Sequence, residues 1–130
     1  MAAVDHTELK TYQVAGIRHR TLAGPEQGLK SLEVWEQTVA SGGSTPEHRH
    51  PCEEVFVILQ GAGRLTIEGK AIDFAVGATL TVPPDRVHKV ENVGSEDLVY
   101  LAILGMSPVT LATADGTPIQ RPWLSNEATS

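Results

Sequence analysis

The residue types that bind metal ions gather in one short window of this sequence, between positions 48 and 54. On an extended chain, His48, His50 and Glu54 have the same parity, so their side chains project from one face. A fourth ligand comes from His88, which begins a new strand directly after the turn Pro83-Pro84-Asp85. The spacing therefore predicts that three imidazoles and one carboxylate converge on one metal site.

This set of ligands favours particular metals. Neutral imidazoles with one carboxylate suit Fe, Mn, Ni, Cu, Co or Zn, whereas Ca²⁺ and Mg²⁺ prefer shells made only of oxygen. If the ion is six-coordinate, two positions stay open for water, O₂ or substrate, which is typical of a catalytic site. We expect one divalent transition metal ion per chain, with Glu54 as both a ligand and a candidate catalytic base.

The elements that must position these ligands read as short strands. From Ala62 to Tyr100 apolar residues alternate with polar ones, and turn residues recur about every eight positions. The segment 29–40 mixes helical spacing with strand-forming residues, and we expect a strand there. Leu98–Leu104 is apolar at every position, which predicts a strand covered on both faces, one of them facing a partner subunit. Residues 105–130 have no sustained period and read as an irregular tail.

Nine glycine, proline, asparagine and candidate ligand positions follow a known sequence pattern. Their spacing resembles the two signature motifs of the cupin superfamily, and in particular its small single-domain bacterial members. Only 15 residues separate the two motifs, and Asp85 stands where the family usually has Gly, a change that Asp tolerates because it accepts left-handed turn geometry. The matched positions are Gly42, His48, His50, Glu54 and Gly61 in the first motif, and Gly77, Pro83, His88 and Asn92 in the second.

The resemblance implies a fold and a set of activities. The fold would be an all-β double-stranded β-helix, a jelly-roll barrel, formed by one domain over residues 1–130 with its core at about 30–104. His48, His50, Glu54 and His88 fall on the family's metal-ligand positions. On these four ligands the family hosts dioxygenases, isomerases, decarboxylases and lyases.

The charge of the expected metal site limits the class of substrate that it would bind. A divalent ion with one carboxylate ligand leaves a net charge of +1 inside an apolar barrel, which favours a small anionic or enolisable substrate. We expect a small metalloenzyme, with dioxygenase-type oxidative cleavage ahead of isomerase, lyase or epimerase chemistry. The alternative is a non-enzymatic module that binds or senses a small ligand, but 130 residues contain no visible effector region.

Several nearby side chains have two readings. Phe56 continues the inward parity of Glu54 and would line the pocket, as substrate contact or ordinary core. Arg86 could clamp a substrate carboxylate at the barrel mouth or pair with acidic neighbours on the surface. Trp35 could cap the pocket or pack at a subunit contact.

The remaining candidates are assigned to the surface or to packing. Cys52 could be a fifth ligand, but a small apolar filler near the rim is favoured. Glu53 should face outward, opposite Glu54. We expect His6 and His19 to be solvated, because His19 is flanked by Arg18 and Arg20, a poor setting for a cation.

Composition excludes several partners. Ten Lys and Arg against sixteen Asp and Glu give a net charge of −6, which argues against nucleic acid. A single cysteine cannot form an internal disulfide, and no apolar run is long enough to span a membrane, so we expect a cytoplasmic protein. Exposed strand edges and the apolar segment Leu98–Leu104 predict a homodimer.

Overall fold

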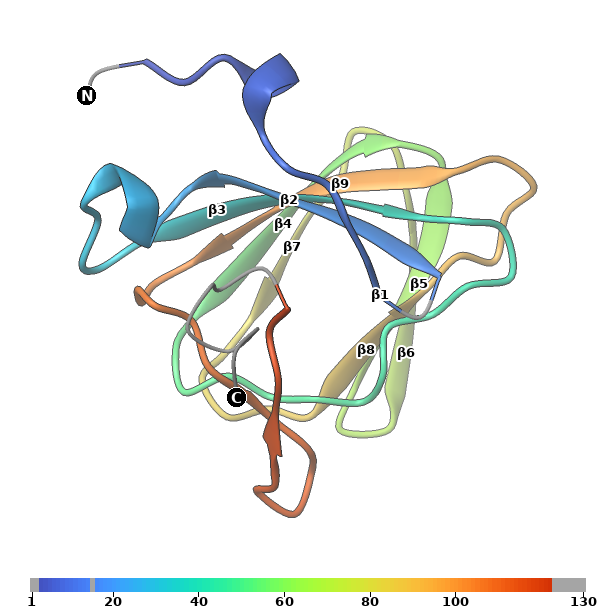
Figure 1. Ribbon diagram of the computed structural model, residues 1–130. Helices are drawn as coiled ribbons and strands as arrows, with labels where there is room; N and C mark the ends of the chain where they lie inside the picture. The colour runs from blue at the N-terminus through green and yellow to red at the C-terminus, as the bar shows by residue number, and fades with distance from the viewer. Residues whose placement is uncertain (1–2, 15, 123–130) are drawn as a thin grey trace.

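Two antiparallel sheets curve around a shared interior in the computed structural model, which describes residues 3–14 and 16–122 (Figure 1). The larger sheet has the order β1 (Tyr12–Val14), β2 (Ile17–Ala23), β3 (Glu33–Val39), β9 (Leu98–Leu104), β4 (Glu54–Gln60) and β7 (Thr79–Val82). The smaller sheet has the order β6 (Lys70–Ala75), β5 (Ala62–Ile67) and β8 (His88–Glu91). This all-β arrangement confirms the predicted jelly-roll barrel.

Strand β3 settles the ambiguous segment in favour of the predicted strand. It pairs antiparallel with β2 on one side and with β9 on the other, and it buries Glu33, Trp35 and Val39. Backbone hydrogen bonding on both edges outweighs the helical spacing of its apolar residues.

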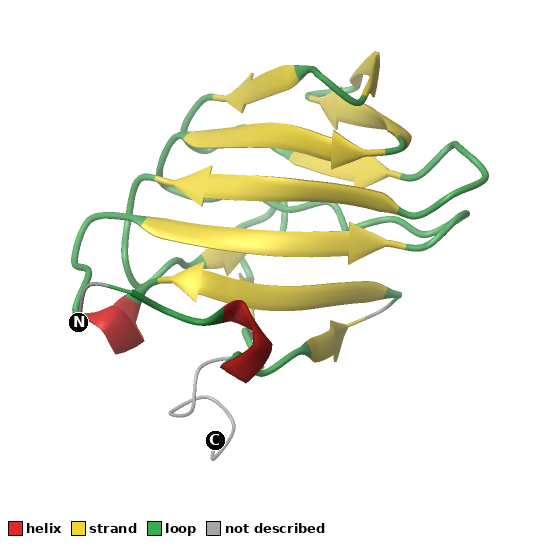
Figure 2. Cartoon of the chain, turned by 90° about the horizontal axis from the view of Figure 1, so that it is seen from above, coloured by secondary structure: helices red, strands yellow, loops and turns green. Residues whose placement is uncertain are grey.

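Strand β9 lies in the middle of the larger sheet, whose strands are seen side by side in Figure 2. It pairs with both β3 and β4, and alternate residues are fully buried inside the barrel. The residues between them are also apolar, but they are only half-buried on the outer face. The chain itself therefore covers the inner face of this strand fully and the outer face only in part. The inward residues are Leu98, Tyr100, Ala102 and Leu104, and the outer ones are Val99, Leu101 and Ile103.

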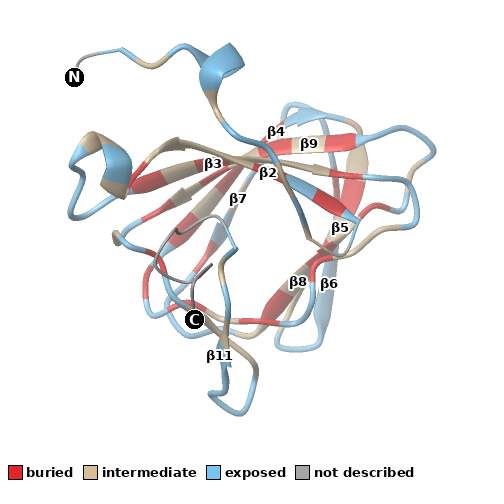
Figure 3. Cartoon of the chain, viewed as in Figure 1, coloured by how far each residue is buried: buried red, intermediate tan, exposed pale blue. Residues whose placement is uncertain are grey.

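The edge strand β6 buries less than its alternating sequence suggests. Phe74 faces the core, but Ile72 and Val76, which share its parity, are 45% and 61% exposed. Among the described residues, strand β6 pairs only with β5, so no strand of this part of the chain lies along its outer edge (Figure 3). An alternating pattern indicates which face points inward, and the position in the sheet decides how much of that face is covered.

The regular structure extends beyond residues 30–104 on both sides. Strands β1 and β2 add to the larger sheet, and short 3₁₀ helices occur at η1 (His6–Glu8) and η2 (Pro25–Gln27). After β9, the expected irregular tail forms a small hairpin of β10 (Leu111–Ala112) and β11 (Pro118–Ile119). The part of this expected tail from 123 to 130 lies outside the described residues.

Gly63 on β5 is packed closely against its neighbouring strands β6 and β8. A Cβ atom there would lie 2.6 Å from Phe74 Cζ and 2.8 Å from the Glu91 carbonyl oxygen. Because the carbonyl belongs to a paired strand, the Gly63→Ala variant is expected to lose about 2–3 kcal/mol of unfolding free energy, measured by urea denaturation.

A matched control is Gly94→Ala, because the nearest atom to a Cβ at Gly94 is 3.5 Å away. That variant should stay within about 0.5 kcal/mol of the unsubstituted protein. Equal stability of the two variants would contradict the close approach at Gly63.

Candidate metal centre

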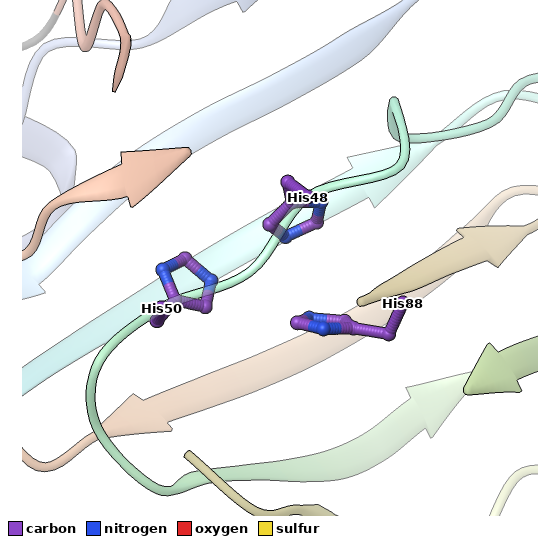
Figure 4. A group of neighbouring side chains, drawn as sticks. All are labelled: His48, His50 and His88. Atoms are coloured by element: carbon purple, nitrogen blue, oxygen red, sulfur yellow. The ribbon is translucent and has the colours of Figure 1, made fainter. Parts of the chain in front are cut away.

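The four predicted ligands come together on the inner side of the barrel. His48 and His50 lie on the segment that joins β3 to β4, Glu54 begins β4 and His88 begins β8. The backbones of His48 and His88 exchange hydrogen bonds of 3.0 and 2.9 Å, which places the two residues directly opposite one another. All four residues are at most 7% exposed. The candidate ligand atoms of the three histidines lie within 4.8 Å of one another (Figure 4).

Each imidazole is oriented by a backbone carbonyl behind it. The Nδ1 atoms of His48, His50 and His88 lie 2.7, 3.0 and 2.8 Å from the carbonyl oxygens of Pro46, Thr110 and Arg86. A carbonyl oxygen only accepts, so each Nδ1 carries the proton and each neutral ring presents the Nε2 lone pair. This tautomer is the one that a metal ion requires.

The carboxylate of Glu54 faces these lone pairs. Its Oε1 atom lies 3.1 Å from His88 Nε2 and 3.4 Å from His50 Nε2. Carboxylate oxygens and unprotonated Nε2 atoms are both acceptors, so a cation or a shared proton must lie between them. Among the described residues, His50 Nε2 is buried with no hydrogen-bond partner. The donor set therefore fits a transition metal ion bound by three imidazoles and one carboxylate.

Burial and mutual charge determine the pKa values of the metal-free site. Burial and the neighbouring imidazoles lower the pKa of His48 to about 4, and burial also lowers the pKa of His50. Burial acts against charge on Glu54 and His88 too, but their hydrogen bond and the attraction between opposite charges together outweigh it, lowering the pKa of Glu54 and raising that of His88. The site thus keeps His48 and His50 neutral and Glu54 ionised at neutral pH, which is the state that binds metal.

A cavity adjoins this site inside the barrel. His48 and Glu54 form one part of its lining, and the rest is mainly aromatic and aliphatic. Trp35 is 2% exposed and its ring lies edge-on to His50, with 6.1 Å between ring centroids. The apolar lining includes Ile17, Trp35, Phe56, Val90, Leu111 and Ile119. An organic molecule in this cavity would have one end near the metal ligands and its body against apolar walls.

A chain of polar side chains also borders the cavity. Tyr100 Oη donates to Gln37 Oε1 at 2.7 Å, which turns the amide nitrogen of Gln37 toward His19 Nδ1 at 3.0 Å. His19 Nε2 then donates to Thr21 Oγ1 at 2.8 Å. Every link has a donor and an acceptor, so the chain is satisfied with His19 neutral.

The expectation that His19 is solvated was wrong. The residue is 0% exposed, whereas Arg18 is exposed and Arg20 pairs with Glu36 on the outer face of the sheet. The exposure of the flanking arginines does not indicate the exposure of His19, because adjacent residues of a strand point to opposite faces. The parity of His19 with Ile17 was the signal that could have placed it inside.

Burial lowers the pKa of His19 to about 3 from an ordinary value near 6.5. The unfolded chain therefore binds one more proton between these values, so the contribution of His19 to stability is complete above pH 6.5 and is lost as the pH falls toward 3. Between pH 6.5 and pH 4.5 we expect the wild-type unfolding free energy to fall by about 2–3 kcal/mol more than that of His19→Gln.

Urea denaturation of both proteins across this range checks the expectation, because all other titrating groups are shared. His6→Gln, at an exposed position, is the control for the loss of a histidine. Parallel curves for wild type and His19→Gln would show that His19 is accessible to protons in the folded protein.

The structure also places the other residues that the sequence suggested for the site. Phe56 is 3% exposed and lines the cavity, as predicted from its parity. Arg86 lies on an exposed turn, and its carbonyl oxygen, rather than its side chain, contacts the site through His88. The strand begins only at His88, so the alternation that would have carried the Arg86 side chain inward does not hold there. Asp85 has a φ of 61°, the left-handed geometry expected of it.

Cys52 and Glu53 agree with their favoured readings. Cys52 is 9% exposed, burial raises the pKa of its thiol to about 11, and the residue belongs to the buried hydrophobic cluster. Glu53 is exposed and Glu54 is buried, so the two adjacent carboxylates point to opposite faces.

The fold and the site define a cupin whose three clustered imidazoles can hold a metal ion. The chain belongs to the auxin-binding protein family, because the model of that family matches residues 3–120. Among the residues that the structure describes, no helix is long and apolar enough to cross a membrane.

Comparison with individual proteins agrees with this assignment. The chain is 42% identical over 110 residues to auxin-binding protein 1 of Arabidopsis thaliana, covering 77% of this chain but only 56% of that relative's length. It is 27% identical over 106 residues to gentisate 1,2-dioxygenase of a Ralstonia species, covering 76% of this chain and 30% of the relative. The crystal structure of a predicted oxalate decarboxylase from Thermotoga maritima superposes with a TM-score of 0.72, covering 80% of this chain and 98% of the other at 22% identity.

Proposed function

We propose that this protein binds a small organic anion through a metal ion held by His48, His50, Glu54 and His88. The observation that carries the proposal is the cavity next to the metal ligands, whose lining is mainly aromatic and aliphatic. Its other polar lining residues are Thr45, Gln120 and the hydrogen-bonded chain of Tyr100, Gln37 and His19. The similarity to auxin-binding protein 1 supports a small-molecule ligand.

Charge balance favours an anion with an apolar body. A divalent ion supplies a Lewis-acidic centre, and with one carboxylate ligand the centre keeps a charge of +1. In a cavity of low dielectric constant this charge attracts a carboxylate or enolate far more strongly than it would in water. The walls formed by Trp35 and Phe56 suit a flat or aliphatic body, and they exclude water from the anionic end.

Calorimetric titration of the zinc-loaded protein tests this proposal. The probe is indole-3-acetate, and its matched control is indole-3-acetamide, which has the same body without the charge. We expect the acid to bind at least tenfold more tightly than the amide, and only to the metal-loaded protein. Equal affinity for both compounds, or equal binding to metal-free protein, would overturn the proposal.

Oxidative cleavage is the second candidate, and the similarity to gentisate 1,2-dioxygenase supports it. In this case Glu54 and the three imidazoles would hold Fe(II), and the cavity would orient a small diol or enolisable acid. Oxygen uptake by the Fe(II)-loaded protein, measured with gentisate, catechol and small diketones, distinguishes this activity from simple binding. Ligand turnover without oxygen uptake would instead point to isomerase, lyase or epimerase chemistry.

Self-association through the outer face of β9 is also proposed. Val99, Leu101 and Ile103 are half-buried there and form an apolar row at the middle of the larger sheet. A second copy of the chain would cover this row, as predicted from the sequence. Sedimentation at micromolar concentration should give a dimer, and a monomer would contradict this expectation. The cytoplasmic location likewise stays a prediction of the sequence.

A further inference from the structure

Glu33 is a buried carboxylate outside the metal site. It begins β3 and is 1% exposed, and no ion pair to it is found within residues 3–14 and 16–122. Its Oε1 atom accepts a hydrogen bond from Trp35 Nε1 at 2.8 Å, and its Oε2 atom accepts one from the Val109 backbone N–H at 2.9 Å. The Ser107 hydroxyl adds a longer contact of 3.4 Å. A carboxylate in this position loses its hydration, so its neutral donors must hold it firmly in place.

The segment 105–112, which we call the C-terminal strap, connects Glu33 to the metal ligands. The Thr110 carbonyl oxygen accepts the Nδ1 proton of His50, one residue after the Val109 N–H that Glu33 holds. Further along, Ala112 exchanges hydrogen bonds of 2.8 and 3.0 Å with the backbone of Arg49. The Thr110 carbonyl that orients His50 is therefore held in place on both sides along the strap. On one side the backbone of Arg49 holds Ala112, and on the other the side chain of Glu33 holds Val109.

The second hydrogen bond of Glu33 reaches the same histidine from another direction. Trp35, whose indole N–H is held by Glu33, packs edge-on against His50 and lines the cavity. One carboxylate thus holds both the strap behind His50 and the aromatic ring beside it.

We propose that Glu33 is a positioning residue for the metal centre, acting on His50 through Val109 and on the cavity wall through Trp35. The inference rests on the metal site of the proposed function and adds a residue that orients it. An amide cannot replace the carboxylate, because Gln offers one acceptor oxygen where Trp35 and Val109 require two. The Glu33→Gln variant therefore keeps the volume of the side chain and loses one of the two hydrogen bonds.

Cobalt(II) titration of Glu33→Gln tests the effect on the site. We expect a dissociation constant about tenfold higher than that of the wild type, together with a changed visible spectrum of the bound ion, since groups behind metal ligands tune their geometry. Glu36→Gln is the matched control, because Glu36 lies on the outer face of the same strand and pairs with Arg20. This control should keep the wild-type spectrum and a dissociation constant within twofold.

Two further measurements use the metal-free protein. The hydrogen-bonded Nδ1 proton of His50 should give a slowly exchanging NMR signal in the wild type, and faster exchange or loss of that signal in Glu33→Gln. In a Trp123→Phe background, where Trp35 is the remaining tryptophan, the emission maximum should shift in Glu33→Gln and not in Glu36→Gln.

The outcomes separate positioning from simple packing. A Glu33→Gln protein that loses unfolding free energy but keeps the wild-type cobalt affinity, spectrum and His50 signal would overturn the inference. If the wild type binds cobalt(II) but no organic anion, the proposed function fails and a weakened, spectrally altered Glu33→Gln site still supports the inference. If the wild type binds no cobalt(II), an unchanged His50 signal in Glu33→Gln overturns the inference, and a lost signal supports it.

Discussion

The His50→Ala variant is expected to purify without stoichiometric metal and to bind added cobalt(II) or zinc(II) at least 100-fold more weakly than the wild type. Within the described part of the chain, His50 Nε2 is a buried atom with no hydrogen-bond partner, at 3.4 Å from Glu54 Oε1. The lone pair therefore has no packing role that would explain its position, whereas a cation shared with Glu54 and His88 would use it. Removing this imidazole leaves two nitrogen ligands and one carboxylate.

Elemental analysis of protein purified without added metal measures this loss, and titration with cobalt(II) gives the change in affinity. His6→Ala is the control for the loss of a histidine, because His6 is exposed and distant in sequence from the ligands. The folded state should survive in His50→Ala, since the main anchor removed is a single hydrogen bond to the Thr110 carbonyl. A His50→Ala protein with one tightly bound metal ion would show that the ligand set is assigned incorrectly.

The convergence of the candidate ligands could be predicted because it depends on local rules. Parity along an extended chain places His48, His50 and Glu54 on one face, and the turn before His88 sets the start of its strand. Parity could not show that His48 and His88 pair backbone to backbone, because this contact joins segments 40 residues apart in the sequence. That pairing is what brings the fourth ligand to the other three.

The residues that sequence reasoning missed share a dependence on distant partners. Glu33 sits in an ordinary alternating strand, and nothing nearby in the sequence indicates that Ser107 and Val109, 74 and 76 residues later, approach its carboxylate. The charges of Arg18 and Arg20 favour a solvated His19, whereas its parity with Ile17 matches the buried position that it has in the structure. Ile72 has the same parity as the buried Phe74 but is 45% exposed, because β6 is an edge strand. Periodicity thus gave the direction of these side chains, whereas tertiary pairing gave their burial and partners.

The adjacent carboxylates Glu53 and Glu54 allow a sharp comparison, because the same chemical change can be made at both. Glu54→Gln is expected to bind metal about 100-fold more weakly, since an amide oxygen carries no charge to offset that of the ion. Glu53→Gln should leave the affinity unchanged, because Glu53 is exposed on the opposite face. Equal losses in the two variants would mean that overall charge, and not coordination, governs the affinity.

Glu54→Gln also separates metal binding from folding. In the metal-free wild type, Glu54 Oε1 and His88 Nε2 lie 3.1 Å apart and need a shared proton, whereas the amide N–H of Gln can donate to the Nε2 lone pair directly. We therefore expect the metal-free variant to have an unfolding free energy at neutral pH no lower than that of the wild type. With metal at saturation, its site carries a charge of +2 instead of +1, so an organic anion should bind at least tenfold more tightly than to the wild type. Weaker anion binding by the metal-saturated variant would show that Glu54 contacts the ligand directly as well as the ion.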